Sequence, residues 1–137
     1  MKLYRGSPND RNWQVYVQDI DEKVTSIPRP LRQRQDLANH SPDGFAWGYG
    51  GSGPAQLALA LLADAWGDDR RALRAYQTFK WMLVSVIPQG LPWVISDTIV
   101  CALGKQCERQ KQDADEEQER LEREAAEAVN KSGAPGA

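Results

Sequence analysis

The most constraining feature of the sequence is a glycine-rich stretch that leads directly into an apolar segment. Four glycines fall within six residues, namely Gly48, Gly50, Gly51 and Gly53. This density of glycine indicates backbone with positive φ or close approach by another group, and we expect positive φ in at least one of the last three. Pro54 suits the first turn of a helix. Because residues 54–66 are apolar on nearly every side, they predict a buried central helix.

Two further helices are expected after the central one. Gly67 is placed to end the first helix in a left-handed cap, and a second helix is predicted from Asp68 or Asp69 to about Ile87. Its core-facing stripe would recur every three or four residues, and Ser96 would cap a last helix. The residues of the predicted stripe are Leu73, Tyr76, Phe79, Leu83 and Ile87.

Short segments in which apolar and polar residues alternate stand before and after the predicted helices 54–66 and 69–87, and such alternation is typical of strands. Trp13, Val15 and Val17 would share one face of such a strand. Three prolines between residues 28 and 44 are expected to prevent regular structure there, and Pro92 favours a sheet edge. We predict strands over residues 2–5, 13–18, 24–27 and 91–95.

The last part of the chain is dominated by charge. Residues 105–131 contain nine acids and six bases, and Leu121 and Val129 are their only large apolar residues. The segment shows no a/d heptad stripe, so we predict a solvated helix rather than a coiled coil. The expected fold is α+β, with a small antiparallel sheet packed on a buried central helix, a second helix and a long charged C-terminal helix. Residues 1–104 would form one domain, and residues 132–137 a disordered tail.

Composition excludes several classes of function. Cys101 and Cys107 stand six residues apart, about 600° of helix rotation, so no disulfide is expected between them. His40 is the single histidine, and we predict that it bonds locally within a loop rather than serving as a catalytic base. No metal, cofactor or catalytic residue is predicted, which favours a non-catalytic protein over an enzyme. Without an apolar leader or membrane-spanning run, a cytoplasmic location is expected.

The glycine-rich turn is the candidate ligand site. Glycines that open a helix can present backbone N–H groups to an anion. Phe45, Trp47 and Tyr49 would share one face of a strand, which would either pack into the core against the 54–66 helix or stack a base or ring. No lysine follows in the phosphate-loop pattern, so a purely structural turn stays an alternative. The candidate ligand-binding residues are Trp47, Tyr49, Gly50, Gly51, Ser52 and Gly53.

Two charged groups are candidate partner-binding residues. Three arginines in the polar connection form the densest basic patch, and acids crowd the last helix. A net charge of −2 gives no general attraction to nucleic acid or to anionic membranes, so direct binding to either is not expected. The candidates are Arg29, Arg32, Arg34, Glu116, Glu119 and Glu124.

The stretch from His40 to Ala60, with its GFAWGYGGSGPAQLALA core, resembles an uncharacterised family of small proteins from phages, plasmids and prokaryotic genomes. The resemblance implies no activity or catalytic residue; it implies a mobile-element origin. Joined to the acid-rich helix, it favours an interaction protein that inhibits a host defence complex, as an anti-CRISPR protein does, by binding a host protein or ribonucleoprotein in the host cytoplasm. The alternative function is binding of a nucleotide or other anionic small ligand at residues 50–54.

Overall fold

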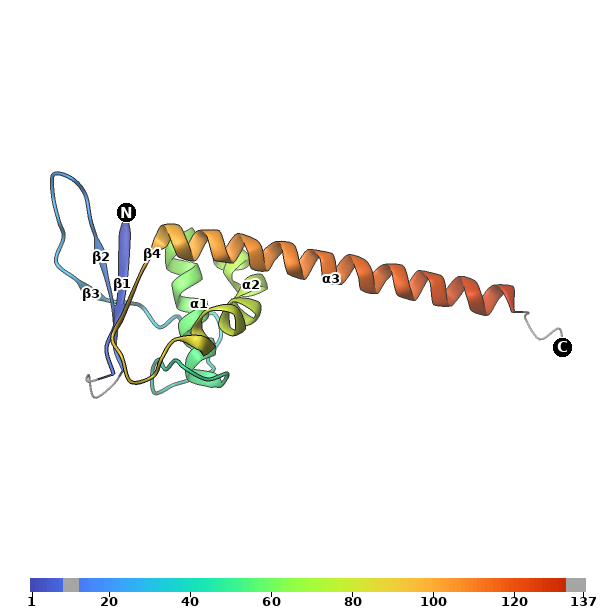
Figure 1. The fold of residues 1–137 in the computed structure, drawn as a ribbon, viewed down its shortest axis with the longest axis horizontal. Helices are drawn as coiled ribbons and strands as arrows, with labels where there is room; N and C mark the ends of the chain where they lie inside the picture. Colours follow the sequence, from blue (N-terminus) through green and yellow to red (C-terminus); the bar gives the residue numbers. More distant parts are fainter. Residues whose placement is uncertain (9–12, 133–137) are drawn as a thin grey trace.

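In the computed structural model, which describes residues 1–8 and 13–132, a four-stranded sheet packs beside three α-helices (Figure 1). Strand β1 (Lys2–Gly6) lies between β2 (Val15–Asp19) and β4 (Trp93–Ser96), and β3 (Arg29–Pro30) pairs with the outer side of β2. Every pairing is antiparallel. The predicted α+β class is confirmed, and β4 is an edge strand, as Pro92 indicates.

The third strand is not where the sequence predicts it. Residues 24–27 form no strand, and only Thr25 makes an isolated bridge to Ile20. Instead β3 lies inside the connection that was predicted to be irregular. Pro30 is tolerated there because β3 is at the edge of the sheet, where a missing N–H breaks no ladder on the outer side.

The inner face of the sheet follows the predicted alternation. Tyr4, Val15 and Val17 are almost completely buried, and Tyr4 pairs with Val17 across the strands. The Tyr4 hydroxyl donates a 2.6 Å hydrogen bond to Oδ2 of Asp64, which joins the sheet to the central helix. Burial is the main reason that the pKa of the Tyr4 hydroxyl lies above its ordinary value, and this hydrogen bond to a carboxylate raises it further.

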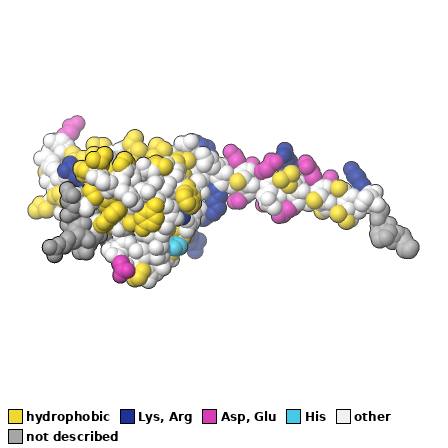
Figure 2. All heavy atoms as spheres, turned by 60° about the horizontal axis from the view of Figure 1, so that its bottom comes forward, with side chains coloured by type: hydrophobic (Ala, Val, Ile, Leu, Met, Phe, Trp, Pro, Cys, Tyr) yellow, Lys and Arg dark blue, Asp and Glu magenta, His cyan; other side chains and the backbone are white. Residues whose placement is uncertain are grey.

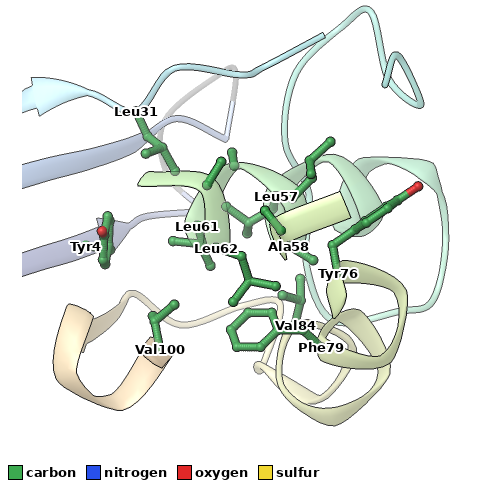
Figure 3. Close-up of a cluster of buried hydrophobic side chains, with 14 of the residues drawn as sticks. Tyr4, Leu31, Leu57, Ala58, Leu61, Leu62, Tyr76, Phe79, Val84 and Val100 are labelled. Atoms are coloured by element: carbon green, nitrogen blue, oxygen red, sulfur yellow. The ribbon is translucent and has the colours of Figure 1, made fainter. Parts of the chain in front are cut away.

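The central helix, α1 (Ser52–Trp66), is buried on all sides, as predicted. Every residue from Gly53 to Ala63 is buried. Figure 3 shows Leu61 and Leu62 between Tyr4 of the sheet and Phe79 of the second helix. Gly67 has φ of 64°, and its N–H donates to the Ala63 carbonyl, which confirms the left-handed cap.

The second helix, α2 (Asp69–Met82), is shorter than predicted and is followed by a short 3₁₀ helix, η1 (Val84–Val86). The predicted stripe is wrong at Leu73, which is 38% exposed. The small side chains of Ala72 and Ala75 let α2 approach α1 closely. A pattern based on large apolar side chains does not predict a buried face that is made partly of alanine. The residues that α2 buries are Ala72, Ala75, Tyr76, Phe79 and Lys80.

The last helix, α3 (Asp97–Lys131), starts as predicted, with the Ser96 side chain accepting from the Ile99 N–H. It packs against α1 and α2 through Val100, Gly104 and Cys107, which are buried. A Cβ at Gly104 would lie 2.5 Å from the Trp66 ring, so glycine is needed for this close approach.

Polar contacts extend the packed part of α3 by one turn. Arg71 forms a bidentate ion pair with Glu108 at 2.7 and 2.8 Å, and Lys111 donates to the Arg74 carbonyl. From Gln112 onward every described residue is exposed, and the helix projects away from the body (Figure 1). Of the tail that was predicted to be disordered, residues 133–137 lie outside the described residues.

We expect Gly104→Leu to destabilise the protein by about 1–3 kcal/mol, the usual cost of overpacking, because the added side chain meets the buried Leu62 and the half-buried Trp66 side chains. Ala102→Leu is the matched control, since Ala102 is exposed on the same helix. The free energy of unfolding from urea denaturation measures both. Equal values for the two variants would show that α3 tolerates separation from α1.

Candidate functional site

The aromatic residues before the glycine-rich turn do not form a stacking platform. Residues 45–49 are not a strand, because Gly48 has φ of 86° and turns the chain out of an extended course. Trp47 is fully buried, and its ring packs against Trp13 and Trp93 with centroids 4.7 and 5.5 Å away. Trp13 itself lies outside β2 and has φ of 48°. Tyr49 is 46% exposed, so of the two predicted aromatic residues only Tyr49 is open to solvent.

The glycines of the turn serve close packing rather than unusual dihedral angles. The expectation of positive φ at Gly50, Gly51 or Gly53 is wrong, because none of them has it. A Cβ at Gly50 would meet the Trp81 ring, and one at Gly51 would meet the Tyr49 ring. At Gly53 a Cβ would lie 2.6 Å from the Ala46 Cβ and 3.0 Å from its backbone nitrogen.

The same turn carries a cation that sequence reasoning missed. Lys80 comes from α2, and its Nζ lies 3.4 Å from the Gly50 carbonyl oxygen and 4.5 Å from the centroid of the Trp81 ring. The side chain is buried although it is charged. Its position beside Phe79 on the inner face of α2 is the only sequence signal of this role. At the start of α1, Ser52 is exposed and Pro54 offers no N–H.

His40 belongs to a polar network that fastens the loop to α1. The Gln56 side chain is fully buried; its oxygen accepts from the His40 and Ser41 N–H groups, and its nitrogen donates to the Gln33 carbonyl. The His40 Nε2 lies 2.6 Å from the Tyr76 hydroxyl. His40 therefore lies in a loop, as predicted, but the prediction of local bonding is wrong, because its hydrogen bonds reach α1 and α2, 16 and 36 residues away.

The three arginines of the connection do not form one free cationic patch. Arg34 pairs with Asp36 and with Asp69, the latter at 2.7 Å, and these hydrogen bonds hold the pKa of both carboxyls below its usual value. Arg29 pairs with Asp19 at 2.9 Å. Arg32 is exposed. Two of the three charges are therefore already matched by carboxylates within the chain.

The candidate acids lie on the projecting part of α3. Glu116, Glu119 and Glu124 are all exposed, and Figure 2 shows acidic side chains gathered along this part of the helix. Glu116 and Glu119 also line a groove of about 500 Å³ where α3 leaves α2, opposite Arg74. The three acids therefore lie together on the projecting part of α3, more than sixty residues after the glycine-rich turn in the sequence.

Other classes of site find no support in the residues that the structure describes. Within residues 1–8 and 13–132, no three His, Cys, Asp or Glu side chains gather as a metal site would require. No helix there has the length and apolar character needed to cross a bilayer. Burial raises the pKa of the Cys107 thiol to about 11, which disfavours the reactive thiolate.

A family model matches residues 4–106, about three-quarters of the chain. The chain belongs to the family of unknown function DUF6166. No curated protein and no solved structure matches it. The DUF6166 region takes in the sheet except the first two residues of β1, together with α1, α2 and α3 as far as Gln106, and the acid-rich projection lies beyond it. The glycine-rich turn is thus inside the DUF6166 region, and the candidate acids are outside it.

Within the DUF6166 region, we expect Gly53→Val to cost about 1–3 kcal/mol of stability, because its side chain would meet the Ala46 backbone, which cannot move aside. Gly50→Ala should cost less than Gly53→Val, since the Trp81 side chain that it meets is 60% exposed and can rotate away. Thermal unfolding of both variants tests this order. A larger loss for Gly50→Ala would show that the Trp81 ring is fixed.

Proposed function

We propose that this chain is a non-catalytic interaction protein that binds a basic partner through the acid-rich part of α3. The observation that carries the proposal is the length of helix that leaves the body. Each of the twenty residues from Gln112 to Lys131 is exposed. Their side chains hydrogen-bond to one another within the segment, and the Ser132 hydroxyl at the cap donates to the Val129 carbonyl. At 1.5 Å per residue the segment is about 30 Å long.

The charge of this segment favours a basic partner. It holds eight acids and three bases, which gives a formal charge of 3 − 8 = −5, against −2 for the whole chain. A local field of one sign steers a partner of the opposite sign and fixes its orientation. The eight acids are Asp113, Asp115, Glu116, Glu117, Glu119, Glu122, Glu124 and Glu127.

The proposed partner is a host defence complex such as a CRISPR ribonucleoprotein. This part of the proposal is supported by the resemblance of the glycine-rich motif to mobile-element proteins and by the acid-rich part of α3. About 30 Å of duplex DNA carries roughly eighteen negative charges, far more than the net −5 of the rod. Charge mimicry by itself is therefore weak, and we propose that α3 adds specific side-chain contacts to it.

The combined variant Glu116→Lys, Glu119→Lys and Glu124→Lys should weaken inhibition of the partner at least about tenfold, because rod and partner would then repel. The matched control is the combined variant Asp21→Lys, Glu22→Lys and Asp43→Lys, since these acids are exposed on the body and the change in net charge is the same. The measurement is inhibition of a purified defence complex by the full chain.

Equal loss in both variants would contradict a specific role for α3. A catalytic role makes a different prediction, because an essential acid or base contributes about 10²–10⁴ in rate. His40→Ala and Ser52→Ala should leave inhibition within a few-fold. A large loss in either, with the circular dichroism spectrum unchanged, would indicate an active site at the loop or the turn.

We propose a second candidate function, binding of an anionic small ligand at the glycine-rich turn, because Lys80 brings a buried positive charge to Gly50. ATP and inorganic phosphate should then raise the melting temperature, by an amount that corresponds to about 2.7 kcal/mol at a hundredfold excess over Kd. Lys80→Met should abolish the shift, and Lys105→Met, at an exposed position, should keep it. No shift in the wild type would dismiss this function.

A further inference from the structure

The buried residues of α3 define which face of the helix continues into the projection. Val100, Gly104 and Cys107 are buried at successive steps of four and three residues. The next step of four reaches Lys111, whose Nζ donates to the Arg74 carbonyl of α2 at 2.9 Å. This face therefore points toward the other helices for three turns.

The same steps continue after the body ends. Alternating steps of three and four from Lys111 reach Ala114, Gln118, Leu121, Ala125 and Ala128, which we name the α3 stripe. Leu121 is the large apolar member and is 49% exposed. The sequence predicts no a/d stripe here because alanine and glutamine give little apolar signal, and only the packed start of α3 reveals where the stripe begins.

Acids border the α3 stripe on both sides. At about 100° per residue, Asp115 and Glu122 lie along one edge, and Glu117 and Glu124 lie along the other. The positions of these four acids relative to the stripe are those of the e and g residues that select a partner helix in coiled coils.

Two of the three positive charges of the projection lie away from the α3 stripe and its acidic edges, and the third, Lys131, stands at the end of the second acidic edge. Arg123 is on the far side of the helix from Leu121. Arg120 lies outside the second acidic edge and reaches Glu117 at 2.6 Å and Glu124 at 3.9 Å. These pairs are more than half exposed, and such pairs are weak, so a cation from a partner can replace Arg120.

We propose that the α3 stripe is the docking face for a basic amphipathic helix of the partner. This inference rests on the proposed function and adds the face and the chemistry of the partner. A helix with leucine along its own stripe and lysine or arginine at both edges would bury Leu121 and pair with the four flanking acids. The alanines of the stripe let the two backbones approach closely.

A second copy of this chain does not fit the same face. In a parallel pair, Glu117 of one copy would lie opposite Glu122 of the other, since g and e residues meet across such an interface. In an antiparallel pair, g residues face g residues, and the register that sets Gln118 opposite Leu121 brings Glu117 against Glu124. Like charges in these positions repel, so the acidic edges select a basic helix and reject a copy of α3.

The test uses a synthetic peptide as the probe: a designed four-heptad helix with leucine at a and d and lysine at e and g. Binding of the labelled peptide to the full chain is followed by fluorescence anisotropy. Leu121→Glu removes the apolar anchor and adds a negative charge, so charge alone would strengthen binding. We expect it to weaken binding at least about tenfold, as loss of a central anchor does.

Ala126→Glu is the matched control, because it adds the same charge about 140° away from Leu121. This variant should bind the peptide as tightly as the wild type or more tightly. Both substituted residues are exposed and lie beyond the body, so neither substitution disturbs the core. Circular dichroism checks that α3 stays helical.

Three outcomes would overturn the inference. If Leu121→Glu and Ala126→Glu both strengthen binding, the acidic rod attracts the peptide by charge alone; the proposed function stands and the docking face fails. If the wild type does not bind the peptide, the docking face and the proposed basic partner both fail. Concentration-dependent self-association in sedimentation, abolished by Leu121→Glu, would assign the α3 stripe to a second copy of the chain.

Discussion

The structure depends on the complete burial of α1. A helix that is apolar on every side has no stable position at a surface, so it must be enclosed by other elements. Here the sheet covers it through Tyr4 and Val17, α2 through Phe79, and α3 through Val100. The glycine-rich turn belongs to the same requirement, since Gly53 lets the start of α1 lie directly against Ala46.

Enclosing α1 also explains the shape of α3. Only the first turns of that helix are needed to cover the core, and Gly104 and Cys107 are its last buried residues. The remaining turns continue from the packed part, where Arg71 and Glu108 form the outermost bidentate ion pair. A segment that is already helical loses less conformational freedom on binding than a disordered one would.

Several features of the candidate sites could not be predicted from the sequence. Alternation placed Trp47 and Tyr49 on one strand face, but a positive φ at Gly48 separates a buried ring from an exposed one. The density of glycine indicated either positive φ or close approach, and only the positions of Trp81 and Ala46 distinguish the two. Lys80 reaches Gly50 from thirty residues away, a contact that local patterns do not encode.

The sequence by itself determined the α+β class, the buried central helix with its Gly67 cap, and the charged character of the last helix. Each of these follows from local chemistry: side-chain polarity, periodicity and the freedom of glycine. Tertiary structure alone decided which edge β3 joins, which residues of α2 face α1, and where on α3 the stripe begins. These depend on partners distant in sequence, because a short contact such as that of Gly104 with Trp66 fixes the rotation of a whole helix.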